Sequence, residues 1–186
     1  MSHTSILQFR TANCKNCYKC IRNCPVKAIR VTNQQAQIIE EQCILCEKCI
    51  AVCPQHAKVE HDDIPAIQRV IASGKKVIAS VHPAYLARYG WNSIGDLEKY
   101  LQKMGFWKAF DAAQGAAVMK EEYTRLLREQ QQKKLVISSN CPVVVRLIET
   151  KYPHLTEYLA PVYSMKQMHA AYLREQYPDA SIVYIS

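Results

Sequence analysis

The chain has 186 residues, 49% of them hydrophobic, and a formal net charge of +8. This length suits one medium domain and one small domain, and no segment approaches the roughly 18 apolar residues of a membrane-spanning helix. The N-terminus shows no export signal, so a cytoplasmic location is expected. The basic residues are scattered rather than aligned in a stripe, which argues against nucleic acid and favours an acidic protein partner.

Eight of the nine cysteines form two copies of the motif Cys-x2-Cys-x2-Cys-x3-Cys-Pro, and corresponding positions lie 29 residues apart. This pattern is typical of bacterial iron–sulfur proteins, in which the fourth cysteine of each copy binds the other cluster. The motifs therefore predict two [4Fe–4S] clusters. The predicted ligands are Cys14, Cys17, Cys20 and Cys53 for one cluster, and Cys43, Cys46, Cys49 and Cys24 for the other.

Zinc sites, disulfides and free thiols are less favoured roles for these cysteines. Zinc sites with four cysteines use two Cys-x2-Cys pairs separated by a longer gap, whereas a third cysteine follows at once in both motifs here. Disulfides need an oxidising compartment, and free buried thiols would not repeat in register. Ala28 and Ala57 lie four residues after the fourth cysteines, where a cluster would leave little room for a larger side chain.

A short hairpin is predicted in this first region, with strands at residues 28–31 and 36–39 around a polar turn. Beyond it, helices and strands alternate. Helices are expected over residues 61–74, 93–105, 112–132, 142–152 and 164–177, and strands over residues 76–81, 106–111, 134–139 and 181–186. The expected fold is an α+β ferredoxin-like domain over residues 1–62, followed by an α/β domain with a mostly parallel sheet over residues 63–186.

Two local signals mark helix starts within the second region. Ser93 and Asp96 suggest a capping box, and Pro142 suits a first helical turn. The ninth cysteine, Cys141, precedes that proline and follows the predicted strand at 134–139. A helix N-terminus favours a thiolate, so Cys141 is a further candidate metal ligand or nucleophile. A small buried residue at a strand–helix corner is the alternative.

Four segments of the second region resemble the catalytic domain of the [FeFe]-hydrogenases. They are VHPAYLARYG (81–90), AFDAAQGAAVMKEEYTRLL (109–127), SSNCPVVVRLIETKYP (138–153) and APVYSMKQMHAAYL (160–173). With the cysteine motifs in front, the resemblance covers nearly the whole chain. It implies that residues 63–186 form the first part of a hydrogenase-like α/β domain.

The resemblance also implies roles for single residues. Cys141 matches the first of four cysteines that hold the cubane part of the H-cluster, and Glu122 and Ser164 match catalytic residues of the proton-transfer route. Asn140 stands where active members carry a proton-delivering cysteine, and an amide cannot transfer protons near neutral pH. Arg125 replaces a relay carboxylate. The other three H-cluster cysteines belong to motifs expected after the last residue, so neither an H-cluster nor hydrogenase activity is expected from this chain alone.

These observations predict an iron–sulfur electron-transfer protein that exchanges electrons with a redox protein partner. The altered relay residues favour a sensory or regulatory branch of the hydrogenase-like proteins. The alternative is a fragment or subunit of an active or sensory [FeFe]-hydrogenase whose remaining motifs lie on another segment or chain. An exposed strand edge would favour a complementary hydrogenase-like chain or self-association.

Overall fold

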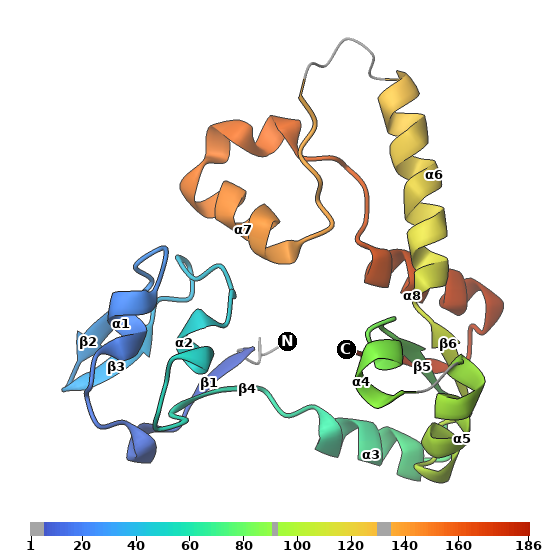
Figure 1. The fold of residues 1–186 in the computed structure, drawn as a ribbon, viewed down its shortest axis with the longest axis horizontal. Helices are drawn as coiled ribbons and strands as arrows, with labels where there is room; N and C mark the ends of the chain where they lie inside the picture. The colour runs from blue at the N-terminus through green and yellow to red at the C-terminus, as the bar shows by residue number, and fades with distance from the viewer. Residues whose placement is uncertain (1–5, 91–92, 130–134) are drawn as a thin grey trace. The chain divides into compact units, whose positions relative to one another are not determined.

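The computed structural model describes residues 6–90, 93–129 and 135–186. The chain divides into two compact units, whose elements are drawn in Figure 1. Unit 1 combines the chain up to Asp62 with Cys141–Glu157, and unit 2 combines Asp63–Asn140 with Tyr158–Ser186. Each unit is therefore assembled from segments that are distant in sequence.

Unit 1 contains two antiparallel strand pairs that repeat each other. β1 (Leu7–Phe9) pairs with β4 (Lys58–Glu60), and β2 (Ile29–Thr32) pairs with β3 (Gln35–Ile38). The register repeats as well: Phe9 pairs with Lys58 and Ile38 pairs with Ile29, and Phe9 and Ile38, like Ile29 and Lys58, are 29 residues apart. The predicted hairpin is confirmed, whereas the pairing of β1 with β4 joins distant segments that carry no local signal.

The helices of unit 1 are short. The 3-10 turn η1 (Thr11–Asn13) precedes the first cysteine motif, and α1 (Lys19–Asn23) and α2 (Lys48–Ala51) begin just before the third cysteine of each motif. The predicted helix at 142–152 forms as α7 (Pro142–Lys151), with its proline in the first turn, and η2 (Pro153–Tyr158) follows.

Arg146 attaches α7 to the cysteine region. Its guanidinium donates one hydrogen bond to the carbonyl oxygen of Cys43 and another, at 2.7 Å, to that of Glu40. A guanidinium satisfies two carbonyl groups at once because its N–H donors are held in a rigid planar fork. This contact explains why residues 141–157 belong to unit 1.

Unit 2 is built on a parallel sheet of three strands in the order β6–β5–β7. The central strand β5 (Val77–Val81) pairs with β6 (Lys108–Asp111) on one side and with β7 (Ser181–Ile185) on the other. Every residue of β5 is buried, as expected for a strand covered on both faces. The predicted parallel sheet is confirmed.

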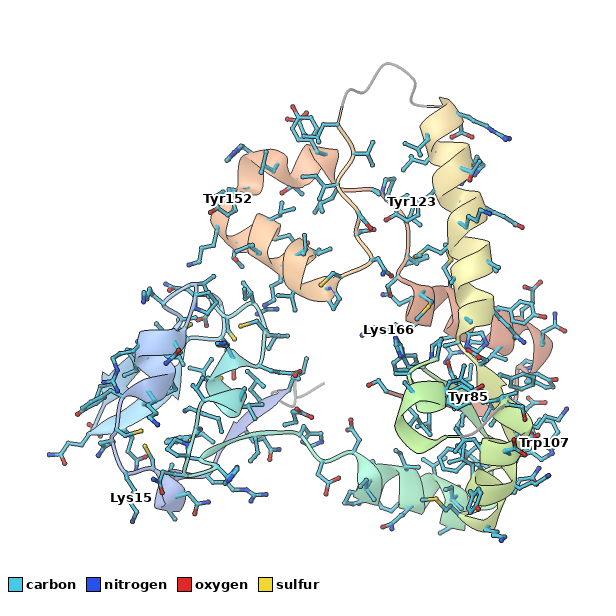
Figure 2. The ribbon with its side chains drawn as sticks, viewed as in Figure 1. Lys15, Tyr85, Trp107, Tyr123, Tyr152 and Lys166 are labelled. Carbon is cyan, nitrogen blue, oxygen red and sulfur yellow. The ribbon has the colours of Figure 1, made fainter. Side chains whose placement is uncertain are left out.

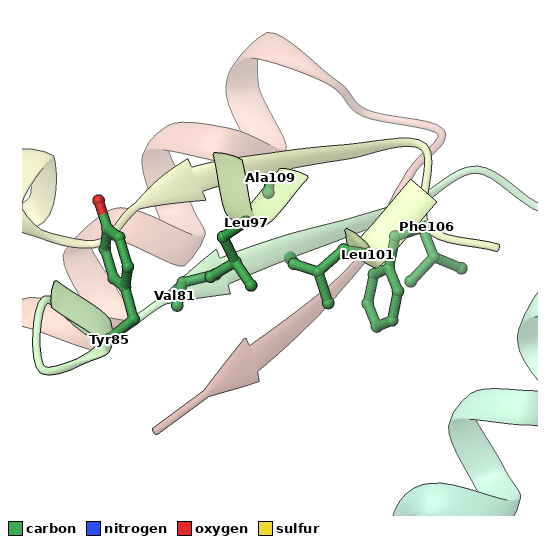
Figure 3. Close-up of a cluster of buried hydrophobic side chains, with 8 residues drawn as sticks. Val81, Tyr85, Leu97, Leu101, Phe106 and Ala109 are labelled. Carbon is green, nitrogen blue, oxygen red and sulfur yellow. The ribbon is translucent and has the colours of Figure 1, made fainter. Parts of the chain in front are cut away.

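Helices cover both faces of this sheet. Val77, Ala79 and Val81 alternate along β5 and form a core with side chains of α3 (Ile64–Ala72) and α5 (Ile94–Lys103), part of which is drawn in Figure 3. On the opposite face, Ser80 Oγ forms a 2.8 Å hydrogen bond with Nδ1 of His169. The helices that complete the unit are α4 (Tyr85–Tyr89), α6 (Ala113–Glu129) and α8 (Met165–Gln176). Within the described ranges, no helix has the length and apolar character needed to cross a membrane.

The predicted strand at 134–139 is wrong. Its first residue lies outside the described residues, and the rest forms a single parallel bridge between Ile137 and Leu159 instead of joining the sheet. Leu135 is exposed. Tyr123 on α6, labelled in Figure 2, holds this segment through a 3.0 Å hydrogen bond between its hydroxyl and Ser138 Oγ. The apolar run led to a wrong strand prediction because an apolar pattern does not specify which neighbour a segment will pair with.

The predicted capping box at the start of α5 does not form. Ser93 lies at the expected N-cap position, but its hydroxyl donates to the carboxylate of Asp96 at 3.0 Å rather than accepting from the backbone. A complete capping box occurs instead at α8, between Ser164 and Gln167. The last residues of the helix predicted over 112–132 fall beyond Glu129, outside the described part of the chain.

The close contact between α6 and α8 leads to a stability prediction. A Cβ atom added at Gly115 would collide with the carbonyl oxygen of Met165 and lie 2.7 Å from the Cβ atom of His169, which is fully buried. Gly115→Ala should therefore lower the free energy of unfolding by about 1–3 kcal/mol, although alanine is the better helix former. Urea unfolding followed by circular dichroism measures the change.

Gly95 provides the matched control because it lies inside α5 with room around it. The nearest atom to an added Cβ is Ser93 Oγ, at 3.7 Å. Gly95→Ala should raise the free energy of unfolding by up to about 1 kcal/mol through helix propensity alone. A similar stabilisation by Gly115→Ala would show that α6 and α8 are not in tight contact at that position.

Candidate metal centres

Four cysteines from both motifs line a single cavity in unit 1. Cys14, Cys17 and Cys20 come from the first motif, and Cys53 is the last cysteine of the second. A second cavity repeats this arrangement. Its cysteines are Cys43, Cys46, Cys49 and Cys24. Each cavity therefore has the composition of one predicted ligand set, while ligation itself stays a prediction.

Backbone amides point at the sulfur atoms from equivalent places in the repeat. The amide of Ala28 lies 3.2 Å from Cys24 Sγ, and the amide of Ala57 lies 3.3 Å from Cys53 Sγ. In addition, the amide of Leu45 lies 3.4 Å from Cys43 Sγ. N–H groups at these distances stabilise negative charge on sulfur, whether on a thiolate or on a bound cluster.

The thiols differ in how their surroundings affect ionisation. Burial raises the pKa of Cys49 to about 11, with the neighbouring Cys43 adding to the effect. For Cys53, burial alone would raise the pKa, but backbone N–H groups that include that of Ala57 outweigh it and lower the pKa. Metal ligation requires the deprotonated thiolate, so loading a metal group at the buried Cys49 would release a proton.

The loops around the cysteines use an unusual backbone conformation in both motifs. Six residues other than glycine have φ values between +48° and +59° and form three pairs that are 29 residues apart: Asn16 and Leu45, Tyr18 and Glu47, and Lys27 and His56. Left-handed residues cost of order 1–3 kcal/mol each, so they persist only where the surroundings impose them. Changes of backbone handedness let successive N–H groups converge into a concave anion site of the kind that holds iron–sulfur groups.

The donor set fits an iron–sulfur group. Thiolates are soft ligands that prefer zinc, copper(I) or iron–sulfur clusters. Among the described residues, no three His, Cys, Asp or Glu side chains are placed to hold a single metal ion. The four cysteines of each set line one cavity, as the ligands of a polynuclear group would. Ala28 and Ala57, which are 1% and 2% exposed, form part of these walls and leave room inside.

A buried lysine beside the first cavity was not predicted from the sequence. Lys58 is only 2% exposed, its ammonium group donates to the carbonyl oxygen of Ala36 at 2.5 Å, and it lies 3.5 Å from the centre of the Phe9 ring. Burial lowers the pKa of Lys58, while the sulfur of Cys20 acts in the opposite direction. The repeat did contain a signal for burial: the residue 29 positions before Lys58 is the aliphatic Ile29, so the equivalent position favours a buried side chain.

The other predicted site residues lie elsewhere. Cys141 is exposed and is the N-cap residue of α7 in unit 1. Ser164 is buried at the N-cap of α8, where its hydroxyl donates to Gln167 at 2.7 Å. Asn140 approaches the same helix start, since its side-chain oxygen accepts a 3.1 Å hydrogen bond from the Met165 amide. The structure therefore brings Ser164 and Asn140 to one helix terminus.

Glu122 occupies a separate place on α6. Its carboxylate accepts a 2.6 Å hydrogen bond from Arg125 one turn further along the helix, and that arginine also approaches Glu129 at 3.5 Å. The Glu122 carboxylate stabilises the charged guanidinium and raises the pKa of Arg125. Glu122, which was predicted to act in proton transfer, is thus hydrogen-bonded to Arg125, the residue that replaces a relay carboxylate.

These features define an iron–sulfur protein with an attached α/β unit, and comparison with known proteins identifies both parts. Residues 13–57 match the 4Fe-4S dicluster domain. Residues 75–186 match the C-terminal domain of the iron only hydrogenase large subunit. The chain therefore belongs to the iron-only hydrogenase large-subunit family, and the predicted resemblance is confirmed.

Three curated relatives come from redox assemblies. NADP-reducing hydrogenase subunit HndD of Solidesulfovibrio fructosivorans is 27% identical over 163 residues, which cover 78% of this chain and 28% of HndD. A subunit of the ion-translocating oxidoreductase complex of Methanosarcina acetivorans is 50% identical over 44 residues, covering 24% of this chain and 17% of that protein. The thiosulfate reductase electron transfer subunit PhsB of Salmonella typhi is 24% identical over 120 residues, covering 59% and 62%. The matched regions span less than two thirds of each relative.

Solved structures share the fold. An [FeFe]-hydrogenase structure from work on oxygen inactivation of the H cluster matches with a TM-score of 0.54 and 24% identity, covering 67% of this chain and 38% of that one. A variant of the [FeFe]-hydrogenase HydA1 from Chlamydomonas reinhardtii matches with a TM-score of 0.52 and 24% identity, covering 67% and 37%. The fold of this chain is thus similar to that of hydrogenase domains.

The tight wall of the first cavity leads to a prediction about metal loading. Ala57→Leu places a larger side chain in a nearly fully buried position beside the four cysteines. If each cavity binds one iron–sulfur group, this variant should cut the iron content after anaerobic reconstitution by about half, because the leucine side chain would occupy the space of one of the two groups. Ala51→Leu, at an exposed position on α2, is the control and should retain full iron content. Full loading of Ala57→Leu would show that this cavity is not where iron binds.

Proposed function

We propose that the chain is an electron-transfer protein that carries two [4Fe–4S] clusters. Cys14, Cys17, Cys20 and Cys53 would hold one cluster, and Cys43, Cys46, Cys49 and Cys24 the other. The observation that supports this assignment is the pair of cavities, each lined by three cysteines of one motif and the last cysteine of the other. The same exchange of the fourth ligand is the known behaviour of this motif in two-cluster ferredoxins.

The surrounding residues have defined tasks in this proposal. A bound [4Fe–4S] group supplies reversible one-electron redox chemistry. The amides of Ala28 and Ala57 would stabilise the negative charge of the sulfur ligands, and the small alanine side chains would leave space for the cluster. The apolar residues Leu7, Ile29 and Ile38 line the second cavity and would limit the access of water to it.

The electron path would run between a redox protein partner and the hydrogenase-like part of the assembly. The net charge of +8 supports an acidic partner, because opposite charge accelerates encounter between proteins. The relatives are named as subunits of redox assemblies, which supports a role within a larger complex. A cytoplasmic location would keep the cysteine thiols reduced before cluster assembly.

A second candidate function is supported by the family match over residues 75–186. The chain would then be one part of an active or sensory [FeFe]-hydrogenase. Cys141 is the one cysteine outside the two motifs, so an H-cluster would need ligands from another segment or chain. We propose that the chain by itself turns over no hydrogen. Ser164, Glu122 and Cys141 would acquire their family roles only in the completed assembly.

The proposed cluster content predicts the outcome of anaerobic reconstitution of the full chain. Chemical analysis should find roughly eight irons and eight sulfides per chain, because each cubane contains four of each. Electron paramagnetic resonance of the reduced protein should show two magnetically interacting clusters. One or two zinc ions with no visible absorption would contradict the proposal.

Paired cysteine substitutions test how the ligands are shared. Cys17→Ser with Cys53→Ser removes two ligands from one proposed cluster and should leave the other intact, with roughly four irons per chain. Cys17→Ser with Cys24→Ser removes one ligand from each cluster, so both should become labile and the clean four-iron state should be lost. If each motif instead bound its own cluster, the two double variants would exchange their behaviour.

A further inference from the structure

The two cavities have equivalent scaffolds but different charges. Lys58 begins β4 opposite Phe9, and its counterpart Ile29 begins β2 opposite Ile38. Both side chains are buried, at 2% and 8% exposure. Each of the two residues lines the cavity on its own side of the repeat. One nearly symmetric position therefore holds a cation at the first cavity and a neutral aliphatic group at the second.

The other charged groups near the two cavities either add to this charge difference or are equal at both sites. The first cavity is lined by Lys15 and Lys19 besides Lys58, with no carboxylate, whereas the second is lined by one lysine and one glutamate. These additional side chains are exposed, so solvent and salt screen them. Each motif also receives one guanidinium on a backbone carbonyl, Arg22 on Cys17 at 3.1 Å and Arg146 on Cys43. Lys58 remains as the buried charge that distinguishes the two sites.

The ammonium group of Lys58 is held in a fixed position. It is hydrogen-bonded to the carbonyl oxygen of Ala36 and stacked on the ring of Phe9. Its charge acts most strongly on Cys20 of the first set, then on Cys49 of the second set, and then on Cys14 and Cys53 of the first set. Charges act over longer range in a buried, less polar environment than in water. Lys58 lines the first cavity and not the second, and three of these four cysteines belong to the first set, so its charge acts on more ligands of the first set than of the second.

We propose that Lys58 raises the reduction potential of the cluster held by Cys14, Cys17, Cys20 and Cys53 above that of its neighbour, so that an entering electron resides on this cluster first. The proposal rests on the proposed two-cluster function. When a low-potential donor gives up one electron, the cluster that accepts it gains one negative charge. A nearby buried cation stabilises that reduced state more than the oxidised state, and net charge is one determinant of cluster potential.

The test uses anaerobic redox titration of the reconstituted full chain, followed by electron paramagnetic resonance. The wild-type protein should show two separated reduction steps. Lys58→Ile installs the residue found at the symmetry-related position, and Lys58→Gln removes the charge but keeps a hydrogen-bond donor for Ala36. In both variants, the first step should shift to lower potential by more than the second step, so the separation narrows. Lys58→Arg, which keeps the charge, should retain two separated steps.

Two further measurements make the result decisive. Lys19→Met removes an exposed lysine from the wall of the same cavity and should leave the separation nearly unchanged, since its charge is screened. The Cys17→Ser/Cys53→Ser variant retains only the second proposed cluster and identifies which step belongs to it. Unchanged steps in a fully iron-loaded Lys58→Gln protein would overturn the role of Lys58. Wild-type protein with fewer than two clusters would instead overturn the proposed function.

Discussion

The arrangement of eight sulfur atoms in two sets of four is the constraint on which the structure of unit 1 depends. The unit has few long elements, and its strands contain only three or four residues each. Left-handed residues, inward amides and buried alanines all recur at the same places around the two cavities. We infer that such costly backbone conformations are retained because, around each cavity, they direct sulfur and N–H groups toward the enclosed space.

Unit 2 depends on a different principle, the burial of one parallel strand. β5 has apolar side chains on one face toward α3 and α5, while its other face carries Ser80 against His169 of α8. The close approach of α6 to α8 is possible because Gly115 has no side chain. The two units therefore differ in their source of stability: apolar packing stabilises unit 2, and we infer that metal ligation contributes much of the stability of unit 1.

An internal repeat gives two sites of similar construction that differ in the charge of their lining residues. The exchange of an aliphatic residue for a buried lysine at one equivalent position changes the electrostatics without changing the strand register. At α7, a single arginine attaches a segment distant in sequence to the carbonyl groups of the second motif region.

The amino-acid sequence contained the two cysteine motifs and predicted the positions of most helices and the parallel sheet, because motif spacing and hydrophobic periodicity are local properties. It also carried the hydrogenase resemblance in four short segments. Three features could be seen only in the folded chain: residues 134–139 do not join the sheet, α7 belongs with the cysteine region, and Lys58 is buried. Strand partners, docking of a helix and burial of a charge depend on residues distant in the chain, and local patterns contain no measure of that proximity.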